Sequence, residues 1–192
     1  PANARFDAPL LEFDALSSVQ TLGDFDGDGD LDGLGWWWQQ YWPGPVRVKG
    51  WRNDGQGHFG PMLSFDVSVP SSLYWALDRG NFDGNARTDF VTWFDSVVGV
   101  YTMSAAGTPS LLWQLNVSGI SGRPNVPQAL AVADFDGDGL DDLALCTDVV
   151  RVLPTRGSSF QEIGQIAGSL GTLHVIDLDG NGRPDLVRQD WA

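Results

Sequence analysis

The strongest constraint on the fold is a nine-residue acidic pattern that the chain repeats four times. Each copy reads D/N-x-D-G-D/N-G/A-x-x-D, and the copies occupy residues 24–32, 81–89, 134–142 and 177–185. Their starts lie about 40 to 60 residues apart, which is close to the period of a propeller blade or another stacked β-unit. The sequence therefore predicts a single domain, residues 1–192, built from four related units.

Apolar segments precede and follow every copy of the pattern, so we expect each acidic stretch to be the tip of a β-hairpin. The segments VRVKGW, VGVYTM and VRVLPT follow three of these hairpins, and MLSFDVSV, LLWQLNV and SFQEIGQI come next. The 24 Gly and 11 Pro break the apolar runs and favour strands and turns over helices. Four strands per repeat is the architecture of a blade, so the predicted fold is an all-β propeller of four repeats.

The fourth repeat is short, because few residues follow Asp185. The N-terminal segment ARFDAPLLEF, residues 4–13, resembles the closing strand of a blade. We therefore expect the N-terminal strand to complete the last blade. It can do so within its own chain and close the ring, or in a neighbouring chain and give a larger ring or an open fibre.

The acidic pattern suits calcium, a hard cation that takes about six to eight oxygen ligands. In the first copy Asp24, Asp26 and Asp28 offer side-chain oxygens, while Asp30 offers its backbone carbonyl and Asp32 a further carboxylate. Carboxylates this close repel each other unless a cation neutralises them. One such run could be an ordinary Asx-rich turn. Four in register predict up to four calcium sites.

Charge count ranks the four loops, since affinity rises with the number of charged ligands. The first and third loops carry four carboxylates at the side-chain ligand positions and are expected to bind most strongly. The fourth carries three, and the second carries two, with Ala86 in place of a glycine, so the second is expected to be weakest. The predicted side-chain ligands of the other loops are Asn81, Asp83, Asn85, Asp89, Asp134, Asp136, Asp138, Asp142, Asp177, Asp179, Asn181 and Asp185.

These loops, together with the segment WRNDGQGHFG at 51–60, resemble the FG-GAP/VCBS repeats over nearly the whole chain. Such repeats form calcium-binding β-propellers in integrin α heads, in some fungal and bacterial lectins and in accessory domains of secreted proteins. The resemblance implies ligands at loop positions one, three, five, seven and nine, which adds the main-chain carbonyls of Arg87, Leu140 and Arg183. The chain departs from the usual pattern of this family in two ways: it has a small number of repeats, and its second loop has an incomplete set of acidic residues.

Aromatic residues divide into a core group and a candidate binding group. Trp36, Trp93 and Cys146 occupy equivalent places after their loops, so we expect them to pack between blades. Strand alternation places the side chain of the next tryptophan on the opposite face. The aromatic residues expected to be exposed, and hence the candidates for stacking on sugar rings, are Trp37, Tyr41, Trp42 and Trp51.

Several function classes are disfavoured. A net charge of −14 argues against a nucleic-acid partner, and no apolar run has the length of a membrane span. The N-terminus lacks the basic start and apolar run of a signal peptide, so the chain is expected to be processed. His58 and His174 are the two histidines, and no catalytic constellation accompanies them, so no enzyme is expected. Asn116 begins a weak glycosylation sequon.

The sequence thus favours an extracellular, calcium-binding recognition module, secreted or at the cell surface, whose partner is a glycan or an extracellular protein. Two alternatives stay open. The chain could be the structural subunit of an extracellular homopolymer or fibre, joined through its terminal half-blades. It could also be an accessory domain of a larger secreted enzyme.

Overall fold

The computed structural model describes residues 17–37, 47–66, 75–94, 97–117, 130–146, 149–156, 159–160, 164–167 and 171–190. Within these ranges every regular element is a β-strand and none is a helix. Accordingly, no helix in the described ranges is long and apolar enough to cross a membrane. The all-β prediction is confirmed.

The described residues form three four-stranded antiparallel sheets, each with its strands in meander order, and two two-stranded sheets. The first sheet contains β1 (Ser17–Gly23), β2 (Asp32–Trp37), β3 (Arg47–Asn53) and β4 (Phe59–Asp66). The second contains β5 (Trp75–Gly80), β6 (Asp89–Phe94), β7 (Val97–Met103) and β8 (Pro109–Asn116). The third contains β9 (Leu130–Ala133), β10 (Asp142–Cys146), β11 (Val149–Leu153) and β14 (Gly164–Ala167).

The two-stranded sheets belong to the third and fourth repeats. A short hairpin of β12 (Thr155–Arg156) and β13 (Ser159–Phe160) interrupts the third repeat, so the segment expected as one closing strand is divided between β13 and β14. The fourth sheet pairs β15 (Gly171–Ile176) with β16 (Asp185–Asp190). The N-terminal strand that was expected to complete it, residues 4–13, lies outside the described residues.

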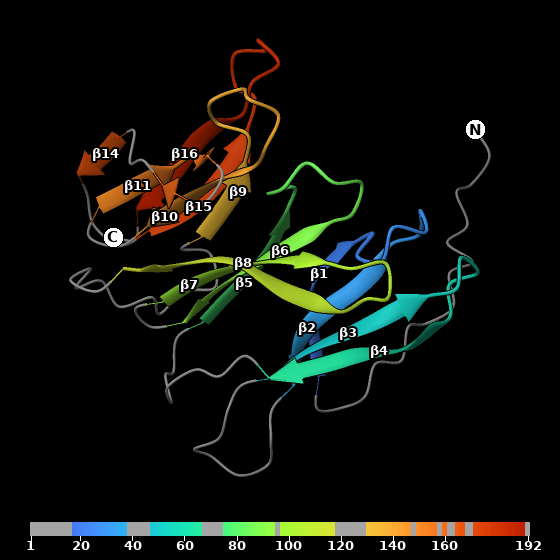
Figure 1. The fold of residues 1–192 in the computed structure, drawn as a ribbon. Coiled ribbons are helices and arrows are strands. Elements are labelled where there is room, and N and C mark those ends of the chain that lie inside the picture. The colour runs from blue at the N-terminus through green and yellow to red at the C-terminus, as the bar shows by residue number, and fades with distance from the viewer. Residues whose placement is uncertain are drawn as a thin grey trace.

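The sheets stack on one another in chain order. The first strands of neighbouring sheets lie side by side, with β1 beside β5, β5 beside β9 and β9 beside β15. The second sheet lies between the first and the third (Figure 1). This arrangement holds the hairpin loops of successive repeats close together.

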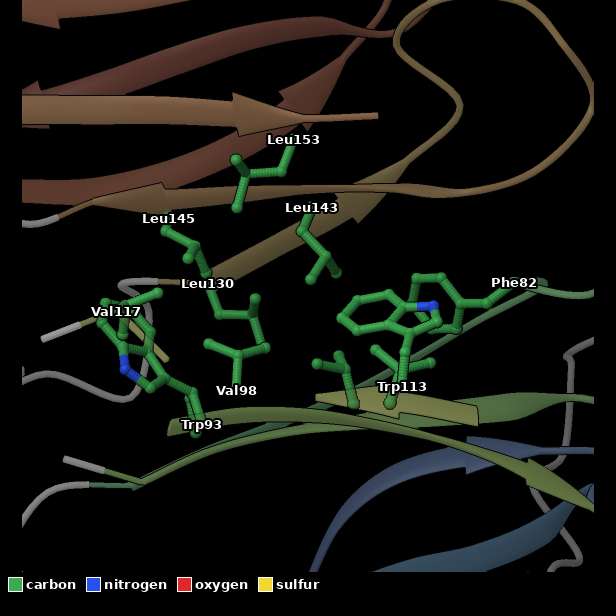
Figure 2. Close-up of a cluster of buried hydrophobic side chains, with 12 residues drawn as sticks. Phe82, Trp93, Val98, Trp113, Val117, Leu130, Leu143, Leu145 and Leu153 are labelled. Atoms are coloured by element: carbon green, nitrogen blue, oxygen red, sulfur yellow. The ribbon is translucent and has the colours of Figure 1, made fainter. Parts of the chain in front are cut away.

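Stacking explains the burial of β6 in the middle sheet. Both of its faces are covered, so β6 is buried at every residue. On one face Val91 and Trp93 join Leu143 of the third sheet in a common apolar cluster, part of which is drawn in Figure 2. On the other face Phe94 meets Trp36 of the first sheet edge to face, with ring centroids 5.0 Å apart, a favoured aromatic geometry.

The predicted core positions are confirmed. Trp36, Trp93 and Cys146 expose at most 2% of their surface. Cys146 belongs to a third apolar cluster, which joins the third sheet to Leu173 of β15. Equivalent positions in the repeats therefore pack at equivalent places between sheets.

Candidate metal centres in the hairpin loops

Each acidic stretch joins the first two strands of its sheet, as predicted. Loop 1 (24–32) joins β1 to β2, and loop 2 (81–89) joins β5 to β6. Loop 3 (134–142) joins β9 to β10, and loop 4 (177–185) joins β15 to β16. Because the loops share one length and one pattern, their residues are numbered from position one to position nine.

Position one organises the turn. The carboxylate of Asp24 accepts hydrogen bonds from the backbone N–H groups of Gly27 at 2.7 Å and Gly29 at 3.0 Å. These glycines have φ angles of 84° and 95°, a region that disfavours other residues. Asp134 and Asp177 accept the same pair of bonds in loops 3 and 4. The loop conformation is therefore built by carboxylate and backbone together.

Position nine anchors the loop in the sheet. Asp32 is fully buried and accepts bonds from the N–H groups of Phe25, at 3.1 Å, and Asn53, at 2.9 Å. Asp142 is equally buried and accepts a bond from Thr155 at 2.7 Å. Burial raises the pKa of both carboxyl groups, and the backbone hydrogen bonds offset only part of this rise. A cation beside them would relieve the cost of keeping them ionised.

Three carboxylates converge in three of the loops. One oxygen from each lies within 4.8 Å of the others in the sets Asp24/Asp26/Asp32, Asp134/Asp136/Asp142 and Asp177/Asp179/Asp185. Two oxygens bound to one calcium ion, at about 2.3 to 2.6 Å each, are at most about 5 Å apart. The donor set is all oxygen, which suits a hard cation. Positions one, three and nine therefore fit calcium in loops 1, 3 and 4.

Position five lies outside these sets, which do not include Asp28 or Asp138, so its role as a calcium ligand stays a prediction. In loop 1 the guanidinium of Arg52, on β3, bonds Asp28 at 2.9 Å and Asp26 at 2.8 Å. This hydrogen bond with Arg52 lowers the pKa of Asp28. Sequence reasoning missed Arg52, whose signal is a basic residue inside the segment 51–60. In loop 1 an arginine already supplies part of the neutralising charge.

In loop 2 neutral donors satisfy the carboxylate at position three. Asp83 accepts hydrogen bonds from the Thr102 hydroxyl at 2.6 Å and from the Asn85 amide at 2.7 Å. Asp89 is fully buried and accepts a bond from the Phe82 N–H at 2.9 Å. Its other oxygen is buried without a hydrogen-bond partner among the described residues. With two carboxylates, loop 2 provides fewer anionic ligands than the others, and its weaker binding stays a prediction.

Backbone hydrogen bonds join neighbouring loops. The N–H of Thr88, at position eight of loop 2, donates to the carbonyl of Asp24, at position one of loop 1, at 2.8 Å. The N–H of Asp141, at position eight of loop 3, donates to Asn81 at 2.8 Å in the same way. Position eight of loop 4 is Pro184, which has no N–H. The series of inter-loop bonds therefore cannot continue from loop 3 to loop 4.

Position seven also contributes to the contact between loops. Its side chain lies against the position-four glycine of the preceding loop in the pairs Arg87/Gly27, Leu140/Gly84 and Arg183/Gly137. The side chain of Asp30, at position seven of loop 1, lies instead against Gly55 of the hairpin between β3 and β4. A cation bound to the main-chain carbonyls at this position stays a prediction.

The structure corrects one glycan-binding candidate. Trp51 is 5% exposed, so its expected exposure is wrong. Its ring packs over Gly33, which pairs with it across β2 and β3, and Lys49 lies 5.4 Å from the ring centroid. The missing side chain of Gly33 leaves room for the indole. The side chain of Trp37 and the residues Tyr41 and Trp42 lie outside the described part of the molecule.

A hollow of about 630 Å³ lies beside loop 1, where Asp28 and the hairpin between β3 and β4 line it. Phe59 and Pro61 give it an apolar side. Asp54 and His58 give it a polar side, and their side chains pair at 2.9 Å. This pair lowers the pKa of Asp54. Sequence reasoning did not identify the hollow, although it falls in the segment 51–60.

Comparisons with known proteins bear on the fold and the family. Residues 81–145 match the FG-GAP-like repeat. No curated protein sequence matches the chain. A solved structure of a lectin from Agrocybe aegerita, titled for specific recognition of non-reducing terminal N-acetylglucosamine, is similar with a TM-score of 0.58 and 21% identity over 87% of this chain.

The similar region is 45% of the lectin chain, so this chain spans less than half the length of that protein. At this level of identity the likeness shows a common fold. The family match begins at loop 2 and ends in β10, and so includes two of the acidic loops. Residues 81–145 are therefore an FG-GAP-like repeat region, as the acidic loops predicted.

Proposed function

We propose that this chain is a secreted, calcium-binding module whose repeats act as propeller blades and which recognises a glycan without catalysing a reaction. The observation that carries the glycan part is the hollow beside loop 1. The fold shared with a lectin supports the same reading. The calcium part rests on the three converging carboxylate sets.

The hollow has the chemistry that a sugar ring requires. A pyranose presents an apolar face, which packs on aromatic and proline side chains such as Phe59 and Pro61. Its hydroxyl groups donate to and accept from polar side chains, and Asp54 and His58 offer both functions. Arg52, which also lines the hollow, adds hydrogen-bond donors. Such a mixture of one apolar wall and a few polar groups is typical of small-ligand sites.

Calcium would support this hollow through loop 1. Asp28 lines the hollow and belongs to the same loop as the carboxylates of Asp24, Asp26 and Asp32. A bound cation would fix the loop by neutralising the repulsion between these groups. Calcium is thus proposed to act as a structural ion next to the binding surface.

Two features support a non-catalytic role. The family resemblance and the lectin-like fold are those of binding modules. The converging carboxylates, once held by a cation, would stay ionised and could not act as general acids.

The test is a glycan array probed with the labelled protein in excess calcium, followed by calorimetry on any hit. His58→Ala removes a polar group whose side chain is 72% exposed, so the fold should survive. We expect this variant to lose at least about tenfold in affinity, the equivalent of one good polar contact. The matched control, Leu111→Ala, removes an exposed side chain on β8, away from the hollow. An array without any hit would reject glycan binding, and full binding by the histidine variant would reject this hollow.

A second candidate is the structural subunit of an extracellular assembly. The observation that favours it is a set of exposed apolar side chains at the two ends of the stack of repeats.

A further inference from the structure

A second hollow, beside loop 2, has a positively charged lining. Its volume is about 450 Å³, within the range of small-ligand pockets, about 300 to 1,000 Å³. Loop 2 and the end of β5 form most of the lining, and Val132 and Asp141 of the third repeat complete it. The charged lining residues are Arg79, Arg87 and Asp141, two cations and one anion. The hollow therefore differs in sign from the chain as a whole, whose net charge is −14.

The hollow is lined by residues at which the second repeat departs from the others. Two residues before the loop stands Arg79, where the other repeats have leucine or valine. Position one is Asn81 instead of aspartate, and position six is Ala86 instead of glycine. Position seven is Arg87, a basic residue that only Arg183 of loop 4 matches. All four departures of the second repeat line this one hollow, and three of them remove a negative charge or add a positive one.

These departures leave hydrogen-bond donors without acceptors. In loops 1, 3 and 4 the second carboxylate oxygen at position one accepts the N–H of position six at 2.8 to 3.0 Å. In loop 2 the one amide oxygen of Asn81 accepts the Gly84 N–H at 2.9 Å, and an amide nitrogen takes the place of the second oxygen. Neither that nitrogen nor the N–H of Ala86 forms a hydrogen bond within the described residues. Loop 2 thus has two donors where the other loops have a donor and an acceptor.

The two arginines add further donors. The Nε of Arg87 donates to the carbonyl of Met103 on β7 at 2.5 Å, which holds this half-buried side chain in place. Its terminal nitrogens and the whole guanidinium of the exposed Arg79 form no hydrogen bond or ion pair within the part of the chain that the structure describes. The nearby carboxylates already accept backbone bonds, Asp141 from Asn81 at 2.7 Å and Asp78 from Arg79 at 2.9 Å.

We propose that this hollow binds a small oxyanion, the carboxylate or sulfate group of an acidic ligand. The guanidinium groups of Arg79 and Arg87 suit such a group, because their planar N–H pairs match the spacing of its oxygens. The Asn81 amide and the Ala86 N–H would donate to the same oxygens. The second repeat would then hold an anion beside the loop that has the fewest carboxylates.

The test is an NMR titration of the calcium-loaded chain that follows the backbone amide of Ala86 and the side-chain amide of Asn81. Sodium sulfate and sodium D-glucuronate are the two anions, D-glucose is the neutral control, and sodium chloride keeps the ionic strength constant. We expect saturable shifts of both signals with at least one anion and none with glucose. The anion with the lower dissociation constant identifies the group that the hollow prefers. The readout does not depend on glycan binding beside loop 1.

Two variants test the hollow in different ways. Arg79→Gln removes an exposed guanidinium, so the fold should survive, and the affinity for the anion should fall at least about tenfold. Asn81→Asp places a carboxylate where the amide stood and gives the Ala86 N–H an acceptor, as in the other loops. This second variant should abolish anion binding, because the new charge repels the ligand and takes its donor.

Arg47→Gln is the matched control, because it removes the same charge from β3 and Arg47 does not line the hollow. It should keep the affinity of the unchanged protein, and circular dichroism should show the same β-fold for every variant. Three results would overturn the proposal: no saturable shift with either anion, equal losses of affinity in Arg79→Gln and Arg47→Gln, or undiminished anion binding by Asn81→Asp.

Discussion

Loops 1 and 2 have the same length, the same hairpin position and the same anchoring aspartate, yet they neutralise their charges differently. In loop 1 three carboxylates converge and Arg52 bonds two of its aspartates. In loop 2 amide groups replace two carboxylates, and the Thr102 hydroxyl stands on β7 opposite Asp83, as Arg52 stands on β3 opposite Asp26. Both loops nevertheless keep the bond from position two to position nine.

The comparison separates the loop's shape from its charge. Backbone hydrogen bonds to positions one and nine set the shape, and these are available to an aspartate and in part to an asparagine. The capacity for a cation depends on how many carboxylates remain unneutralised. A repeat can therefore lose its metal site while its hairpin still folds.

The largest expected effect on the free energy of unfolding comes from removing the aspartate at position nine, which anchors both loops in their sheets. Asp32→Ala would leave the buried N–H group of Phe25 and the partly buried N–H group of Asn53 without acceptors, at a cost of about 2 to 4 kcal/mol of unfolding free energy. Asp89→Ala should cost less, because Asp89 accepts one such bond and buries an unpaired oxygen. Urea unfolding in chelator measures both. Equal losses would mean that the two anchors do not differ.

The second largest effect is expected from exchanging the residue types at position one of loops 1 and 2, which are aspartate and asparagine. Excess calcium, at about 100 times its dissociation constant, should raise the unfolding free energy by about 2.7 kcal/mol per site. Asp24→Asn should remove about one such increment, because the loop 1 set falls to two carboxylates. Asn81→Asp should add calcium binding to loop 2. Calcium titrations monitored by denaturation are the measurement, and an unchanged increment in Asp24→Asn would contradict calcium in loop 1.

Removing Arg52 should increase the difference in calcium affinity between loops 1 and 2, because it should strengthen binding in loop 1. Arg52→Ala frees Asp26 and Asp28 from ion pairs with a guanidinium whose side chain is 58% exposed, so calcium affinity in loop 1 should rise by about two- to fivefold. The counterpart Thr102→Val frees Asp83 in loop 2, where the carboxylates still number two, and should give no comparable gain. Calorimetry at low ionic strength compares them. A loss of calcium affinity in Arg52→Ala would show that the arginine organises the site.

The smallest effect is the pH dependence of two aspartates near these loops. Burial raises the pKa of Asp78, which precedes loop 2, so its contribution to stability falls as pH rises above 3.8. The bond with His58 lowers the pKa of Asp54, so its contribution is present above 3.8 and is lost as pH falls below it. Asp78→Asn and Asp54→Asn should therefore change the pH profile of metal-free stability with opposite signs. Urea unfolding in chelator from about pH 3 to 7 decides this, and changes of the same sign would contradict it.

The sequence predicted the parts of this molecule that depend on position within the repeat. The hairpin tips, the strand order and the burial of Trp36 and Trp93 follow because the same offset from each loop gives the same place in each sheet. Converging carboxylates at positions one, three and nine follow for the same reason.

Contacts from the third strand could not be predicted in this way. Arg52 reaches Asp28 from 24 residues away, and which side chain faces the loop depends on the pairing of β2 with β3. The same pairing places Trp51 over Gly33 and buries it. A repeat alignment compares residues along the chain, whereas these contacts depend on the register between strands and on the space that a glycine leaves.

The backbone bonds between loops have a consequence for how the molecule opens. The amide protons of Thr88 and Asp141 are held by a different repeat from their own, so they can exchange with solvent only when two repeats separate. Pro184 has no N–H group, so this series of backbone hydrogen bonds between loops ends before the fourth repeat. We expect native-state hydrogen exchange to find repeats one to three opening as one cooperative unit, with the fourth fraying first and at lower free energy.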